Sequence, residues 1–101
     1  MITLKFVFDK EKVAAAGTTE DALLAPVREH AAKHNIVESK TGVFSKAGED
    51  AYCVVGMIIP KVTETDLRYL DLLKEWTFDV DGEKSDCIKS CREWYQEHGR
   101  L

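Results

Sequence analysis

The sequence predicts an α+β fold in which an antiparallel sheet of three to four strands carries helices on one face. Apolar and polar residues alternate over Ile2–Asp9, which is the period of a half-buried strand. An uncharged apolar run, Tyr52–Ile59, has the length of a buried strand and is too short to span a bilayer. Hydroxyl and acidic residues that start helices stand at 18–21 and 63–66. The predicted order is β-α-β-β-α-(β)-α, a ferredoxin-like variant with an added carboxy-terminal helix.

The first half of the chain supplies a strand, a helix and a second strand. After the strand at 2–9, a helix is expected near 19–35, with its apolar residues facing the sheet. Pro26 lies inside this helix, where proline removes a hydrogen bond and clashes with the preceding turn. We therefore expect either a kink or two short helices, the second starting at Pro26. The segment 36–46 is rich in Val, Thr, Phe and Ser and is expected to be a strand.

The second half supplies the partner of that strand and two more helices. The apolar run forms a strand over 51–59 and pairs with 36–46 across the turn-like segment 47–50. A helix follows near 64–76, and the alternation of Trp76, Phe78 and Val80 allows a short fourth strand at 76–80. The last helix is expected over 85–98, capped by Ser85 and Asp86.

Length and composition indicate one globular domain, 1–101. The 101 residues are 45% apolar and 32% charged, and the net charge is −4. Residues 64–86 hold eight acids against three bases, a net charge of −5. No basic cluster accompanies them, so nucleic acid is not an expected partner. The amino terminus lacks the features of a signal peptide, and no segment has the length of a membrane span. Three cysteines argue against a disulfide framework, and we expect a reducing, cytoplasmic location.

Three groups of residues resemble chemical sites but are better explained as structure. His30 and His34 on one helix, with Cys87 and Cys91 on another, could hold zinc, yet both pairs have the spacing of ordinary core neighbours. Cys87 stands near a helix start, but the adjacent acid opposes a thiolate nucleophile. The segment 79–82 matches only the middle of a calcium loop. No metal, cofactor or catalytic residue is therefore expected, and Cys87 and Cys91 are expected to be mostly buried.

The helix at 64–76 carries more apolar surface than one contact with a core needs. On a helical projection its apolar residues cover more than half of the circumference. The surplus consists of Tyr69, Leu72 and Trp76, with Asp71 and Glu75 at the rim. This surplus packs on the last helix or contacts a partner, and tyrosine and tryptophan are enriched in interface hot spots. These five residues are the predicted partner-binding site.

Function follows less directly than fold, because no motif in the chain is specific to a known family. The leading hypothesis is a small non-catalytic protein-binding module of inhibitor, immunity or regulatory type, acting on a protein partner or as a homodimer. One alternative is a small ferredoxin-like enzyme or ligand-binding domain that acts as a dimer. Another is a zinc-stabilised domain. The strand expected at Tyr52–Ile59 does not alternate, so both of its faces are apolar. The three hypotheses differ in what covers the face that the helices leave open.

Overall fold

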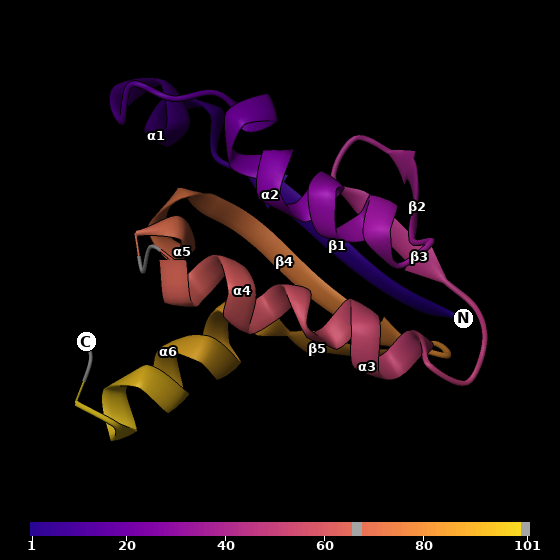
Figure 1. The fold of residues 1–101 in the computed structure, drawn as a ribbon. Coiled ribbons are helices and arrows are strands. Elements are labelled where there is room, and N and C mark those ends of the chain that lie inside the picture. The colour runs from indigo at the N-terminus through magenta and orange to yellow at the C-terminus, as the bar shows by residue number, and fades with distance from the viewer. Residues whose placement is uncertain (66–67, 100–101) are drawn as a thin grey trace.

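The computed structural model describes residues 1–65 and 68–99, which form one layer of sheet and one layer of helices (Figure 1). The elements, in chain order, are β1 (Ile2–Phe8), α1 (Lys10–Ala15), α2 (Glu20–Lys33), β2 (Val37–Lys40), β3 (Val43–Lys46), α3 (Ala51–Gly56), α4 (Ile58–Thr65), α5 (Tyr69–Leu72), β4 (Leu73–Val80), β5 (Glu83–Asp86) and α6 (Cys87–Glu97). The fold class is α+β, as predicted. The sheet has five strands, more than the three to four expected.

The sheet is antiparallel throughout, in the order β2-β3-β1-β4-β5. The central strand β1 pairs with β3 on one side and with β4 along almost its whole length on the other. Its even-numbered residues are buried and Lys5 is exposed, as the alternation predicted. One face of the sheet therefore packs on the helices, and the other carries mostly polar or partly exposed side chains.

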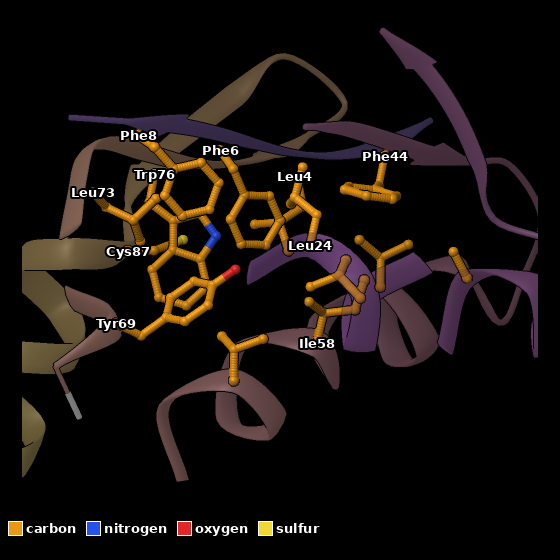
Figure 2. Close-up of a cluster of buried hydrophobic side chains, with 14 of the residues drawn as sticks. Leu4, Phe6, Phe8, Leu24, Phe44, Ile58, Tyr69, Leu73, Trp76 and Cys87 are labelled. Carbon is orange, nitrogen blue, oxygen red and sulfur yellow. The ribbon is translucent and has the colours of Figure 1, made fainter. Parts of the chain in front are cut away.

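The core lies between the strands and the helices. Figure 2 shows Leu4, Phe6, Phe8 and Phe44 pointing from the strands toward the helical layer. The Phe6 ring contacts the rings of Phe44, Tyr69 and Trp76, with centroid separations of 5.8, 6.3 and 5.4 Å. Aromatic pairs at such separations contribute beyond the area that they bury. Packing of the aromatic residues therefore joins β1, β3, β4 and α5.

The hairpin of β2 and β3 is held to the rest of the fold by a glycine and an ion pair. Gly42 has a φ of +79°, and a Cβ there would lie 2.8 Å from the carbonyl oxygen of Phe6. Phe6 N–H donates to the Gly42 carbonyl at 2.8 Å. Arg28 of α2 donates to both oxygens of Glu38, at 2.8 and 3.1 Å, and Gly42 N–H donates to the same carboxylate. The hydrogen bonds from Arg28 lower the pKa of Glu38, so the hairpin is held by a charged pair.

The apolar run is helical, so the expectation of a strand at 51–59 is wrong. It forms α3 and the start of α4, and the segment 36–46 pairs with itself as the hairpin β2–β3. Ala51, Val55, Ile58 and Val62 are buried at helical spacing. Pro60 does not end the segment, because it lies in the first turn of α4, where its missing N–H would have no helical partner anyway. The predicted architecture is wrong in this part of the chain.

The helix expected at 64–76 is also wrong from Leu73 onward. The short helix α5 ends at Leu72, and β4 starts at the next residue. The fourth strand expected at 76–80 is present but begins three residues earlier, where its register with β1 shifts between Val7 and Phe8. Residues 66 and 67 of the expected helix lie outside the described residues. Pairing with β1 has overridden the local helical pattern.

The two remaining helices, α2 and α6, differ from expectation at Pro26 and at the start of α6. Pro26 lies within α2, which the structure assigns as one helix and not as two. The last helix begins at Cys87 with Asp86 as its cap, accepting from Lys89 N–H at 3.1 Å. Ser85, the other expected cap, lies in β5, which pairs with β4. Among the helices that the structure describes, none has the length and apolar composition needed to cross a bilayer.

Candidate functional site

The predicted partner-binding residues do not share one surface. Tyr69 and Trp76 belong to the core, where Trp76 is only 1% exposed. The Tyr69 hydroxyl donates to the Leu23 carbonyl at 3.0 Å, and burial raises the pKa of Tyr69. Trp76 packs on Phe6, and its Nε1 is a buried donor that has no hydrogen-bond partner among the described residues. Both side chains are therefore already occupied by the fold.

The other three predicted residues point in different directions. Leu72 is partly buried against the core, and exposed Asp71 accepts from Arg92 Nη2 of α6 at 2.8 Å. Glu75 pairs with Val7, and both lie on the face of the sheet that the helices leave open. The helical projection that grouped these residues fails because the helix ends at Leu72. Partner binding by these five residues stays a prediction.

The two pairs of potential zinc ligands are likewise not brought together. His30 is buried, and its Nε2 lies 2.8 Å from the Val54 carbonyl, to which it donates, while its ring contacts that of His34. In the described part of the chain, no group of three or more His, Cys, Asp or Glu side chains is placed to hold a metal ion. Cys87 is buried, and burial raises its thiol pKa to about 12, which disfavours a thiolate. Cys91 is partly buried.

A groove of about 270 Å³ lies between α4 and α6, which Figure 1 shows side by side. Its walls are mostly apolar and come from four residues of each helix: Ile59, Pro60, Thr63 and Glu64 of α4, and Ser90, Cys91, Trp94 and Tyr95 of α6. Concave, mainly apolar sites with a few polar groups are the usual form of binding sites in proteins. This α4–α6 groove is the candidate functional site.

The polar groups of the groove are joined to one another. The hydroxyls of Thr63 and Tyr95 lie 2.7 Å apart, and both residues are buried. Tyr95 donates its one hydroxyl proton to the Glu64 carboxylate at 3.0 Å. Thr63 shares its proton between the Tyr95 oxygen and the Ile59 carbonyl, the latter at 3.0 Å. Burial is the main cause that raises the pKa of Tyr95, so the phenol stays protonated at neutral pH. These contacts fix the separation of α4 and α6 and leave the apolar walls to contact a ligand.

Apolar side chains continue from the groove along α3. Val55 faces the core, whereas Tyr52 is 63% exposed and Met57 48% exposed. Cys53 is exposed as well. The Tyr52 ring lies 5.7 Å from that of Phe78, which turns it toward the β4–β5 side of the molecule. The run Tyr52–Ile59 thus leaves Tyr52, Cys53 and Met57 exposed, while Val54 and Ile59 are partly buried against the core.

Trp94 forms the outer wall of the groove on α6. It is 48% exposed and stacks on His98, with centroids 3.9 Å apart and planes inclined by 16°. Its other neighbour is Tyr95, in an edge-on contact at 4.9 Å. The indole is thus held against two rings while about half of it is open to solvent. We refer to Tyr52, Cys53, Met57, Pro60 and Trp94 as the apolar ridge.

Charges of both signs lie next to the groove. Glu64 is the charged residue among those that line it. On a helical projection of α6, Glu93 lies as near to Ser90 as Arg92 lies to Tyr95, and Arg92 pairs with Asp71. Exposed Lys61 follows Pro60 on α4.

Sequence reasoning missed the groove, because it treated Tyr52–Ile59 as a strand. A signal was present: Ala51, Val55, Ile58 and Val62 recur at intervals of three to four residues. With that period, the uncharged residues between them occupy an outer helical side.

In comparisons with known proteins, the chain matches no family model, no curated protein and no solved structure.

Proposed function

We propose that this chain is a non-catalytic protein-binding module whose α4–α6 groove and apolar ridge accept apolar side chains of a protein partner. The observation that carries the proposal is the outer side of α3 and α4, which presents Tyr52, Cys53 and Met57 to solvent where a surface helix normally carries polar residues. Several exposed apolar side chains within one short segment are typical of interaction sites. Trp94, on the opposite wall of the groove, belongs to a residue type that is enriched in binding hot spots.

The chemistry of the groove favours binding over catalysis. Its two buried hydroxyls bond to each other, and burial raises the pKa of the neighbouring Cys91 thiol, which opposes a nucleophilic role. Walls that are mostly apolar suit a hydrophobic contact, which gains free energy in proportion to the apolar area removed from water.

The ferredoxin-like assignment is part of the same proposal. The strand order β2-β3-β1-β4 supports it, with α2 between β1 and β2 and with α3 to α5 between β3 and β4. On this assignment β5 and α6 lie outside the ferredoxin-like pattern. The groove then lies between α4, which belongs to the pattern, and α6, which does not. Because such folds carry many unrelated functions, the argument for binding rests on the apolar ridge and the groove and not on the fold.

Site-specific photocrosslinking in the native cell tests the proposal. A benzophenone amino acid replaces Trp94 in one variant and Met57 in another. A third variant carries it at Lys5, which is exposed on the opposite face of the sheet and serves as the matched control. We expect the same crosslinked protein from positions 94 and 57 and none from position 5. No adduct from either ridge position, or an identical adduct from position 5, would contradict the proposal.

A further inference from the structure

We infer that the free edge of strand β5 pairs with the same edge of a second copy of this chain, so that the two sheets form one continuous antiparallel sheet. The inference concerns a different surface from the α4–α6 groove and goes beyond the proposed function. It rests on the regularity of the β5 edge, on the direction of its backbone groups and on the order of its charges.

Of the two edges that the described strands form, the β5 edge is the regular one. The strand order is β2-β3-β1-β4-β5, so β2 and β5 are the outer strands. The register of β2 against β3 shifts between Glu38 and Lys40, and a bulge of this kind protects an edge from pairing. The pairs between β5 and β4 follow each other without a shift. The β5 edge can therefore add a strand.

Two residues of β5, Lys84 and Asp86, direct their backbone N–H and C=O groups away from the sheet. Asp81 N–H donates at 3.2 Å to the carbonyl of the residue that precedes β1, so the chain bonds toward β1 at this position. Bonding directions alternate along a strand, and Val80 therefore bonds toward β5, where its partner is Glu83. By the same alternation, the groups of Lys84 and Asp86 point to the outer edge, and the order of the described strands ends there.

The order of charges along this edge suits a two-fold axis through Ser85. In the antiparallel pair that such an axis generates, Lys84 lies opposite the partner's Asp86, and Asp86 lies opposite the partner's Lys84. Both pairs exchange the outward-facing backbone bonds and place opposite charges side by side, which stabilises cross-strand pairs. An axis through Lys84 would place two lysines opposite each other. An axis between residues 84 and 85 would set an outward-facing residue against an inward-facing one.

The surface beside this edge has room for a second chain. A hollow of about 470 Å³ lies next to the end of β5 and is lined in part by Lys84, Ser85 and Asp86. Asp86 caps α6 through Oδ1, which leaves Oδ2 to the partner's lysine. Lys74 lines the hollow as well, and the partner's Glu83 would approach it, because the partner's strand continues past Asp86. A pairing of such short strands buries little surface, so we expect a weak dimer.

Sedimentation equilibrium of the full chain at millimolar concentration tests the inference. Lys84→Glu turns both attractive pairs into repulsive ones, and Asp86→Asn removes the pairing charge while asparagine keeps the helix cap. The matched control, Lys40→Glu, makes the same change of charge in the other outer strand. We expect a dimer whose dissociation constant rises about tenfold or more in Lys84→Glu, less in Asp86→Asn, and less than about twofold in the control.

An engineered disulfide measures the register independently of charge. The axis places Ser85 opposite the partner's Ser85 in a pair without backbone bonds, whose Cα atoms lie about 4.5 Å apart. That separation suits a disulfide, so Ser85→Cys should form a covalent dimer on oxidation in a Cys53→Ser background, which removes an exposed thiol. Lys84→Cys is the matched control, because its two copies would lie about 7–8 Å apart, too far for the bond.

The outcomes distinguish this edge from the groove. A monomer at every concentration would overturn the inference, and so would a dimer that Lys84→Glu leaves intact. Equal crosslinking of Ser85→Cys and Lys84→Cys would indicate chance collision and would also overturn it. A dimer that Trp94→Ala dissociates and Lys84→Glu does not would place the contact at the groove instead.

Discussion

The hydrogen bond between Tyr95 and Thr63 holds the two walls of the groove together, and its free energy can be measured. The two oxygens lie 2.7 Å apart in a buried position. Tyr95→Phe removes the hydroxyl and keeps the ring. Thr63 retains the Ile59 carbonyl as an acceptor, and Glu64 lies at the surface, where water can replace the phenol. A buried hydrogen bond contributes about 1 kcal/mol net, so losing the contacts to Thr63 and Glu64 should cost about 1–2 kcal/mol of unfolding free energy.

A double-mutant cycle isolates the contact between the two hydroxyls. Combining Tyr95→Phe with Thr63→Val should give a coupling energy of about 1 kcal/mol, because each single change already removes the shared bond. Tyr69→Phe is the matched control, since the Tyr69 hydroxyl donates to the Leu23 carbonyl at 3.0 Å. Its effect should add to that of Thr63→Val. Urea unfolding at 25 °C, followed by far-ultraviolet circular dichroism, supplies the free energies. Coupling below about 0.3 kcal/mol, or equal coupling with Tyr69, would refute the reasoning.

Two further predictions concern the fold around the site. Gly42→Ala should destabilise the protein more than Gly17→Ala in the same urea assay. Both glycines have a positive φ, which costs alanine about 1–2 kcal/mol. Only at Gly42 would the added Cβ meet a backbone oxygen, at 2.8 Å. Equal losses would show that the contact with Phe6 is not constraining. Burial raises the thiol pKa of Cys87 from its ordinary value near 9 to about 12. Because the folded state holds this proton more tightly, its contribution to stability is complete below pH 9 and is lost as the pH rises toward 12. Stability should therefore fall less steeply over that range in Cys87→Ala, and an unchanged slope would contradict the assignment.

Local periodicity predicted those elements whose burial is one-sided. Ile2, Leu4, Phe6 and Phe8 alternate with less buried residues, and the structure places them along the inner face of β1. The helix expected at 19–35 begins after Thr19, whose hydroxyl accepts from Ala22 N–H at 3.1 Å. In both elements the local sequence pattern predicts the same secondary structure that the fold contains.

The groove was not predicted, because the helical segment on one side of it does not have one apolar and one polar side. Tyr52, Cys53 and Met57 are apolar yet exposed, so the run shows neither strand alternation nor a polar helical side. At Leu73 the error was the opposite: leucines at helical spacing continue into β4, and only the long pairing with β1 makes the segment a strand. Tertiary pairing of this kind cannot be read from the local pattern of a single sequence.

Hydroxyl-radical footprinting, in the purified protein and inside native cells, tests the central claim most directly. In the purified chain Tyr52, Met57 and Trp94 should be modified, whereas Trp76, at 1% exposure, should be protected and serves as the internal reference. Inside the cell the three ridge side chains should become protected, while exposed Val37 on β2 should remain as reactive as in the purified chain. Equal modification of Tyr52, Met57 and Trp94 in both settings would contradict a partner-binding surface on α3, α4 and α6.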